Sequence, residues 1–191
     1  YVPQDSPLEG IFQQHQAKAL KKTGLEVGVL SPPELWSIRL VGRVLDGHPN
    51  GIKVEEIDGI PLFRYYGWIP PRISQSRVWL WFWLRAGRSL YRQYVMNCGV
   101  PDVIHAHNAR YAGILAWRIK QEYHVPYVLT EHSSEYARNL IRDTDFDYIA
   151  SAFRNADKRI VVSSSLGKVL EKTIGDAVTP WHVIPNILDG K

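Results

Sequence analysis

The second half of the chain alternates short apolar runs with longer segments of helical periodicity. The predicted strands cover 102–105, 127–130, 159–163 and 182–184, each around a short apolar run, and the helical segments cover 109–123, 134–155 and 165–174. Strands that alternate with helices of roughly 10–15 residues are typical of βαβ units, which build a parallel sheet. Since the runs are continuously apolar, we expect helices on both faces of this sheet. The pattern predicts an α/β protein with a doubly wound, mostly parallel sheet.

The first half of the chain is less regular. Apolar residues at helical spacing predict a helix over 11–23 that stops at Gly24, and a short strand is expected over 25–30. Two further strands, 52–57 and 60–66, flank Asp58-Gly59, which is a strong hairpin-turn signal. A long helix is expected over 77–96. This half therefore adds an antiparallel hairpin to the otherwise parallel pattern.

Composition places the chain among ordinary globular domains. Of its 191 residues, 45% are hydrophobic and 22% are charged, which is enough apolar material for one full core. Cys98 is the single cysteine, so no disulfide forms within the chain, and a reducing, cytoplasmic setting is expected. No apolar run approaches the roughly 20 residues that cross a bilayer. The net charge of +4 fits an anionic partner but is too weak to predict nucleic-acid binding.

Polar side chains follow three of the predicted strands. Their tips are His105-Ala106-His107-Asn108, Glu131-His132-Ser133 and Ser163-Ser164-Ser165. Neighbouring parallel strands end at the same edge of a sheet, and doubly wound sheets bind ligands outside the carboxyl ends of their strands. We therefore expect one candidate site at that edge, built from His107, Asn108, Glu131, His132, Ser133 and Ser163.

Two other interpretations of these tips stay open. His105 and His107 are also compatible with buried histidines that only hydrogen-bond within the protein. Together with Glu131 and His132 they are compatible with a metal site, although no further Cys, His or Asp pattern supports one. The chain has no G-x-G-x-x-G fingerprint and no P-loop, which disfavours an NAD enzyme and a P-loop NTPase.

The start of the first helix is a candidate phosphate site. If this helix begins at Gly10, its free backbone N–H groups and the helix dipole favour an anion, which can approach closely because glycine has no side chain. Alternatively, Ser6 and Glu9 form a capping box with Pro7 in the first turn.

The long helix over 77–96 contains an apolar run, Val78–Leu84. At about 100° per residue, four arginines and one tryptophan fall on one stripe of this helix: Arg77, Trp81, Arg85, Arg88 and Arg92. A helix with a basic stripe and bulky aromatic residues can lie on an anionic membrane surface. We expect peripheral association with the inner face of a membrane through this helix and the loop at 65–68. A helix packed on the sheet with a solvated arginine face is the alternative.

Six segments of the chain resemble one known family. They are Tyr1–Phe12, Gly24–Val27, Pro101–His107, Pro126–His132, Ala156–Ser163 and Val183–Asp189. In this order they resemble the N-terminal, acceptor-side domain of retaining family-four ("group 1") glycosyltransferases, which is one Rossmann-like half of a GT-B fold. The resemblance covers most of the chain outside roughly residues 34–75.

This resemblance implies an enzyme that moves a sugar from a nucleotide diphosphate donor to an acceptor hydroxyl with retention. It implies a glycan or lipid-linked acceptor, in bacterial cell-surface polysaccharide or glycolipid synthesis, and neither a cofactor nor a metal. Gly10 matches the family's loop near the donor phosphates, and His132 matches the histidine that contacts the transferred sugar. The cleft residues on the acceptor side are His107, Asn108, Glu131, Ser133 and Ser163.

The resemblance also divides the chain. Residues 1–184 match the Rossmann-like domain, whose first strand is expected before Tyr1, and residues 185–191, with Pro185 and Asn186, match the start of the interdomain hinge. The donor-binding domain is expected beyond the hinge, so we expect the 191 residues alone to be inactive. The alternatives are a non-catalytic Rossmann-like binding module and another GT-B enzyme, such as a sugar-nucleotide epimerase or a phosphorylase.

Overall fold

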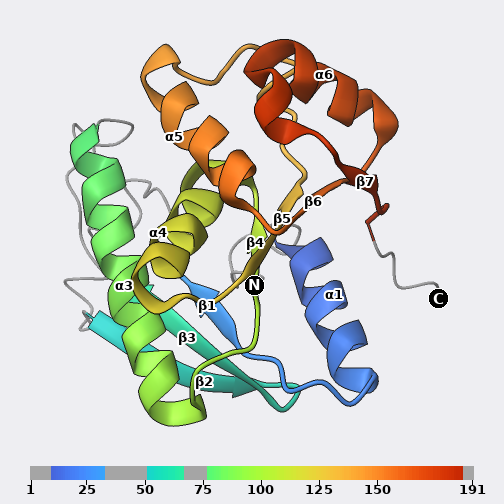
Figure 1. Ribbon diagram of the computed structural model, residues 1–191. Coiled ribbons are helices and arrows are strands. Elements are labelled where there is room, and N and C mark those ends of the chain that lie inside the picture. Colours follow the sequence, from blue (N-terminus) through green and yellow to red (C-terminus); the bar gives the residue numbers. More distant parts are fainter. Residues whose placement is uncertain (1–9, 33–50, 67–76, 187–191) are drawn as a thin grey trace, which may run out of the picture. The chain divides into compact units, whose positions relative to one another are not determined.

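The computed structural model describes residues 10–32, 51–66 and 77–186 (Figure 1). Its contacts divide the chain into two compact units, residues 1–100 with 187–191, and residues 101–186. The expected domain of residues 1–184, followed by a hinge at 185–191, stays a prediction. In the described part of the chain, no helix is long and apolar enough to span a membrane.

The N-terminal unit contains a three-stranded sheet in the order β1–β3–β2. β2 (Gly51–Ile57) and β3 (Ile60–Tyr66) form the predicted antiparallel hairpin, and Asp58 and Gly59 at its turn have φ of 55° and 70°. Two successive positive φ values give the tight turn whose twist matches that of the flanking strands. β1 (Val29–Ser31) runs parallel to β3. The hairpin prediction is therefore confirmed.

The strand expected over 25–30 is shorter and starts later than predicted. β1 pairs with β3 from Val29, opposite Leu62, to Ser31, opposite Arg64. Gly28 lies against the ring of Tyr94 in α3 (Arg77–Cys98), where an added Cβ would come within 2.3 Å of a ring carbon. The chain before Val29 thus packs against a helix and does not extend the strand.

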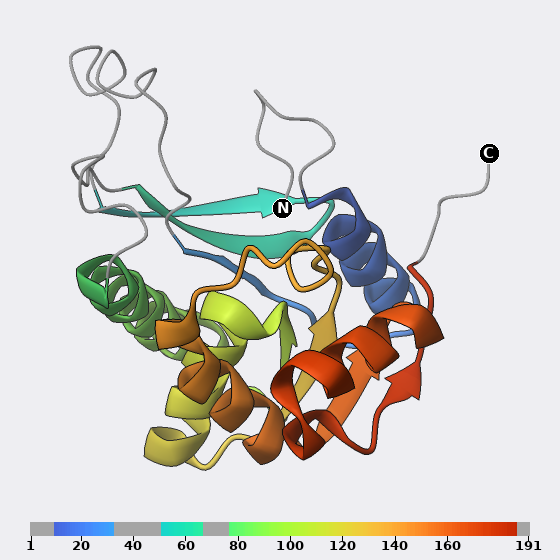
Figure 2. The same cartoon turned by 90° about the horizontal axis from the view of Figure 1, so that it is seen from above.

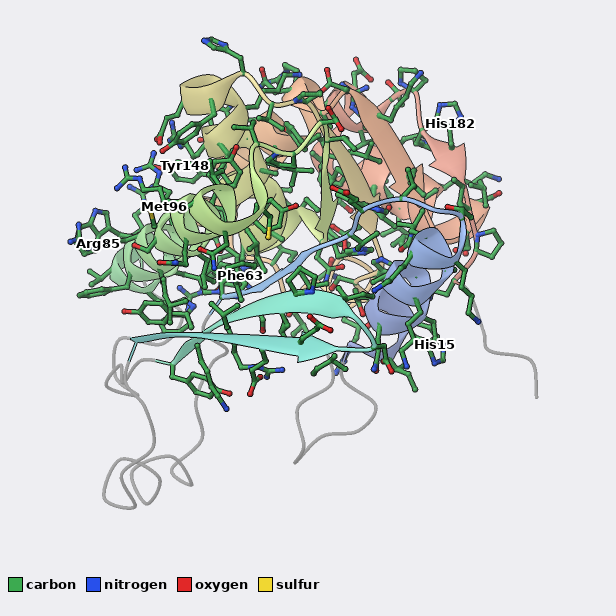
Figure 3. The ribbon with its side chains drawn as sticks, turned by 90° about the horizontal axis from the view of Figure 1, so that it is seen from below. His15, Phe63, Arg85, Met96, Tyr148 and His182 are labelled. Atoms are coloured by element: carbon green, nitrogen blue, oxygen red, sulfur yellow. The ribbon has the colours of Figure 1, made fainter. Side chains whose placement is uncertain are left out.

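Two helices of this unit lie in the described residues, and both confirm the predicted ones. α1 (Ile11–Lys22) is held to the hairpin turn by Lys18, whose Nζ lies 2.8 Å from the Asp58 carboxylate. One face of α3 is buried, and it contains Trp79, Leu80, Trp83, Leu90 and Tyr91. Phe63 of β3 lies beneath α3 (Figure 3) and is fully buried. Because these residues are buried, the opposite face of α3 is exposed to solvent.

The C-terminal unit contains a four-stranded parallel sheet in the order β4–β5–β6–β7. Its strands are β4 (Ile104–His107), β5 (Tyr127–Glu131), β6 (Lys158–Val161) and β7 (His182–Val183). Each connection moves one strand in the same direction, and right-handed crossovers then place all connecting helices on one face. Figure 2 shows α4 (Ile114–Tyr123), α5 (Asp143–Asn155) and α6 (Ser164–Ile174) along that face. The predicted α/β class with a Rossmann-like parallel sheet is confirmed.

β5 is the most buried strand of this sheet. Tyr127 and Leu129 have no exposed surface, and neither does Glu131 at the end of the strand. Thr130, on the opposite face, is only 3% exposed. Side chains of successive residues point to opposite faces of a sheet, so β5 is covered on both faces, as expected for the interior of a parallel sheet.

Three predicted boundaries next to the polar tips are wrong. The strand expected over 102–105 is Ile104–His107, so His105 and His107 both lie within β4, on one face of the sheet. The helix expected over 109–123 begins at Ile114, after an irregular turn, η2 (Ala109–Gly113). The helical region expected over 134–155 is helical only over Asp143–Asn155 and is preceded by turns. The segments that follow β4 and β5 are therefore turns, with backbone N–H groups that need partners outside a helix.

Candidate functional site

His132, directly after β5, is the centre of a hydrogen-bonded cluster at the carboxyl ends of the parallel strands. Its ring Nε2 lies 2.9 Å from Nδ1 of His107 on β4. Its Nδ1 lies 2.8 Å from Oδ1 of Asn186, which follows β7. Its backbone N–H donates to Oδ1 of Asn108 at 3.1 Å. The structure thus brings together residues that the sequence placed on two strand ends and in a hinge.

The partners of His132 restrict where its ring proton can lie. If Nδ1 of His132 carries the proton, it donates to the Asn186 carbonyl oxygen, and Nε2 then accepts from the Nδ1–H of His107. Burial lowers the pKa of His132. Burial, with a smaller contribution from His105, lowers the pKa of His107 to about 2. Both rings are therefore neutral at pH 7, and they can offer hydrogen bonds without adding a charge to the site.

His105 supports His107 from the side. The two rings stack, with centroids 4.3 Å apart and planes at 26°. Nε2 of His105 lies 2.7 Å from Oγ1 of Thr130 on the neighbouring strand. Burial, and then the nearby His132, lower the pKa of His105 from 6.5 to about 4. These contacts fit the interpretation of His105 as an internal hydrogen-bonded histidine.

Acid should destabilise this unit through its buried histidines. The pKa of His105 falls from 6.5 to about 4 on folding. The unfolded chain therefore takes up the proton first, and stability falls as the pH drops from about 6.5 toward 4. We expect a lower urea midpoint at about pH 5 than at about pH 7.5. The pH difference should shrink in His105→Gln and persist in His182→Gln, an exposed histidine of β7. A midpoint equal at both pH values in the wild type would contradict this.

Glu131 is fully buried and holds the turns around the cluster in place. One carboxylate oxygen accepts from the backbone N–H groups of His132 and Ser133, at 3.0 and 2.8 Å. The other accepts from the backbone N–H of Ala109 at 2.8 Å and from the Tyr136 hydroxyl at 3.2 Å. Burial raises the pKa of this carboxyl, and the four donors oppose that shift. The structure thus gives Glu131 the role of supporting the backbone of the turns, and a contact of Glu131 with an acceptor stays a prediction.

The two serines of the predicted cleft have local partners. Oγ of Ser133 accepts from the backbone N–H of Glu135 at 3.1 Å, which closes the turn after His132. Ser163 is the N-cap of α6, and its Oγ accepts from the backbone N–H of Leu166 at 3.2 Å. Among the described residues, no hydrogen bond joins Ser163 to His132. A contact of either serine with an acceptor stays a prediction.

Two residues, one directly before the turn η2 and one within it, have a strained backbone that the sequence pattern does not predict. Asn108 has φ 69°, and Tyr111 has φ 67° with ψ −76°, values that residues other than glycine seldom adopt. Each such residue costs on the order of 1–3 kcal/mol, and strain of this kind gathers at functional sites. Arg110 pins the turn, since its guanidinium lies 3.0 Å from the Asp145 carboxylate on α5 and over the Tyr111 ring. Nothing in the sequence pattern signals this geometry, because the residues have ordinary helical propensities.

Gly10 caps the N-terminus of α1 in the other unit. It has φ 76° and ψ 9°, a left-handed conformation that glycine adopts without strain. Among the described residues no side chain caps this helix start, and its first turn contains no acidic residue. The helix therefore begins where the phosphate interpretation requires, and the alternative capping residues, Ser6 and Glu9, lie outside the described residues. The position of Gly10 relative to His132 stays a prediction.

The metal alternative finds no support in the described ranges. No group of three or more His, Cys, Asp or Glu side chains there has the geometry to hold a metal ion. Both oxygens of Glu131 already accept hydrogen bonds, and His107 and His132 bond to each other. The cluster is built as a network of hydrogen bonds between neutral rings.

Comparisons with known proteins agree with the resemblance. Residues 12–190 match the family model for Glycosyltransferase Family 4. A curated protein of Bacillus subtilis (strain 168), named "Putative teichuronic acid biosynthesis glycosyltransferase TuaC", is 28% identical over 138 residues. The alignment covers 71% of this chain and 34% of that protein, so the chain spans about a third of the length of its relative. The chain belongs to glycosyltransferase family 4.

Proposed function

We propose that this chain is the acceptor-side domain of an enzyme that transfers a sugar from a nucleotide diphosphate donor to an acceptor hydroxyl with retention of configuration. The observation that carries the proposal is the His107–His132–Asn186 cluster at the carboxyl edge of a parallel sheet, in a chain of this family. Doubly wound sheets bind their ligands at that edge. Neutral imidazoles suit a sugar, because sugar hydroxyls both donate and accept hydrogen bonds.

In this proposal His132 contacts the transferred sugar. Both of its ring nitrogens are bonded within the protein, so a sugar hydroxyl must replace His107 or Asn186 as a partner. We place the exchange at Nε2, because His107 can then donate its Nδ1–H to the same hydroxyl. The backbone of His132, in contrast, is fixed by Asn108 and Glu131. The reacting sugar would thus contact the His132 ring, whose backbone is held in place by these two hydrogen bonds.

The donor diphosphate would be received by the start of α1 and by the donor-binding domain. Free N–H groups and the helix dipole at Gly10 attract an anion, and no acidic side chain in the first turn opposes it. Basic groups of the donor-binding domain neutralise the leaving diphosphate in this proposal, so neither a metal ion nor another cofactor is required. The 191 residues alone would accordingly not turn over.

The acceptor would be a glycan or a lipid-linked molecule in bacterial cell-surface polysaccharide or glycolipid synthesis. The printed name of the Bacillus subtilis relative refers to teichuronic acid biosynthesis, which supports a polysaccharide role by similarity. Domains of one family host different substrates, so the acceptor has to be identified by assay.

The test is an assay of the enzyme carrying its donor-binding domain with a panel of UDP- and GDP-hexoses, with and without a bacterial membrane extract as the source of acceptor. We expect nucleoside diphosphate release with at least one donor, and sugar incorporation that depends on the extract. The 191-residue chain should release none. Conversion of the donor to its epimer would support the epimerase alternative, and binding without turnover would support the non-catalytic module.

We also propose that α3 brings the enzyme to the inner, cytoplasmic face of an anionic membrane. On the outward face of its first turns, Val78, Trp81 and Phe82 are 51%, 56% and 40% exposed. Arg77 and Arg85 are exposed beside them, and Figure 3 shows Arg85 at the outer side of this helix. Bulky apolar residues next to arginines suit the boundary between lipid headgroups and acyl chains. Of the predicted stripe, Arg92 is also exposed and Arg88 is half-buried; residues 67 and 68 of the predicted loop lie outside the described residues.

Vesicle co-sedimentation tests this membrane proposal. Vesicles with anionic lipid should bind the protein, whereas neutral phosphatidylcholine vesicles should bind it weakly. The double variant Arg77→Glu, Arg85→Glu should weaken binding roughly tenfold or more, since each basic residue at the surface contributes about 1 kcal/mol. The matched control is Lys168→Glu, Lys172→Glu, an equal charge change on exposed residues of α6. Equal losses in both double variants would mean that net charge, and not α3, is responsible, and the proposal for α3 would fail.

A further inference from the structure

We propose that Asn186 is a positioning residue that holds the ring proton of His132 on Nδ1 and leaves Nε2 as the hydrogen-bond acceptor. Its catalytic consequence rests on the proposed function, whereas the proton position itself does not. Asn186 lies 54 positions from His132 in the chain, and their side chains meet at 2.8 Å. The sequence-based expectation for Asn186 was limited to a hinge segment.

The backbone of Asn186 is well placed for this task. β7 pairs with β6 in parallel, with Val183 opposite Val161. Just beyond the strand, the backbone N–H of Ile184 donates to the carbonyl of Val161 at 3.0 Å. Asn186 follows two residues later, as the last residue of its compact unit. The pairing of β7 with β6 thus positions the amide oxygen of Asn186 next to the His132 ring.

The other ring nitrogen completes the assignment. Nε2 of His132 lies 2.9 Å from Nδ1 of His107, so one of these two nitrogens carries the proton of the hydrogen bond and the other accepts it. With Nδ1 of His132 bonded to an acceptor, that proton belongs to His107. The neutral histidine side chain in water favours the Nε2–H tautomer, so the Nδ1–H form in His132 is a signature of the Asn186 contact.

The tautomer of His132 determines how its ring can bind a sugar hydroxyl. A hydroxyl that takes the place of His107 meets a lone pair on Nε2, so it must donate its proton in a hydrogen bond. If the tautomer were reversed, the same nitrogen would present an N–H, and the hydroxyl would have to accept. The orientation of the Asn186 amide therefore decides whether a sugar hydroxyl at Nε2 of His132 donates or accepts the hydrogen bond. Asn186 is in this sense a positioning residue for the transfer.

Histidine-ring NMR on the ¹⁵N-labelled 191-residue chain tests the proton position. Long-range ¹H–¹⁵N correlations distinguish the two tautomers, and the His132 signals are identified by their loss in His132→Gln. We expect the Nδ1–H tautomer in the wild type and in Asn186→Asp, because a carboxylate oxygen also accepts. In Asn186→Ala the ratio of Nδ1–H to Nε2–H should fall roughly fivefold or more. Asn97→Ala, an exposed residue of α3 that bonds only to Gln93 in the described structure, should leave the ratio unchanged.

A second readout follows the consequence for transfer. In the enzyme carrying its donor-binding domain, Asn186→Ala should lower kcat roughly tenfold while the acceptor KM changes by less than about twofold. An Nε2–H tautomer in the wild type, or a ratio that Asn186→Ala leaves intact, overturns the inference whatever the activity. The expected tautomers together with no sugar transfer in any variant would instead overturn the proposed function and leave the role of Asn186 standing.

Discussion

Replacing His132 by alanine is expected to lower kcat of the enzyme about a hundredfold or more. The ring is the part of the cluster that the proposed function places against the transferred sugar, and a hydrogen bond made in a dry, fixed site contributes far more than one in water. The ring also bonds to His107 and Asn186, so the variant should lose about 1–2 kcal/mol of stability as well. Kinetics measured well below the unfolding midpoint, with circular dichroism as a check of folding, separate the two effects.

His182→Ala is the matched control for this prediction. His182 is an exposed histidine on β7 of the same unit, and its loss should leave kcat within about twofold of the wild type. A His132→Ala enzyme that is less stable but turns over at the normal rate would show that the histidine only supports the fold, and the proposed role at the sugar would then be withdrawn.

Replacing Glu131 by alanine is expected to destabilise the protein by about 4 kcal/mol, the largest single effect on stability in this unit. The substitution leaves the backbone N–H groups of Ala109, His132 and Ser133 without their acceptor in a buried place. Each unsatisfied buried donor costs about 1–3 kcal/mol, with partial relief where water enters. Chemical denaturation measures the loss directly.

Two further variants test whether the loss of stability comes from the hydrogen bonds of the Glu131 carboxylate. Glu131→Gln keeps one carbonyl oxygen but turns an NH₂ group toward donors, so an intermediate loss of about 2 kcal/mol is expected. Glu135→Ala removes a carboxylate four residues away that is half-exposed and lies 3.7 Å from Arg110, so it should cost less than about 1 kcal/mol. Equal losses for Glu131→Ala and Glu135→Ala would contradict the anchoring role.

Much of the fold follows from the sequence pattern. The alternation of apolar runs and helical segments predicted all four strands of the parallel sheet and their connecting helices, because continuous apolar runs are what a sheet covered on both faces requires. The Asp58-Gly59 hairpin was equally clear, since few sequences favour two successive positive φ values. Both signals depend only on residues that are close together in the sequence.

The errors lie where long-range contacts override local propensity. Residues 134–142 have a helical pattern, but the buried Glu131 carboxylate draws in the backbone N–H groups that follow it and the Tyr136 hydroxyl, which favours turns. The positive φ of Tyr111 is held by its surroundings, including the pinned Arg110, and has no counterpart in the sequence.

The candidate site was predictable in its members but not in its connections. The strand tips pointed to His107, Asn108 and His132, which the structure brings into contact. The bond from His132 to Asn186 joins residues that follow two different strands, and no periodicity predicts such a pair. The burial of Glu131 had one signal, a carboxylate placed directly after an apolar strand with no lysine or arginine beside it. Such a group needs several N–H donors when it is buried.

The anomeric configuration of the product shows whether the enzyme transfers sugar with retention. The enzyme with its donor-binding domain would be supplied with whichever nucleotide hexose it consumes, and the new glycosidic linkage would be examined by NMR through its anomeric proton coupling. We expect the anomeric configuration of the donor in the product, both from the wild type and from the slow His132→Ala enzyme. A product of inverted configuration would contradict this expectation.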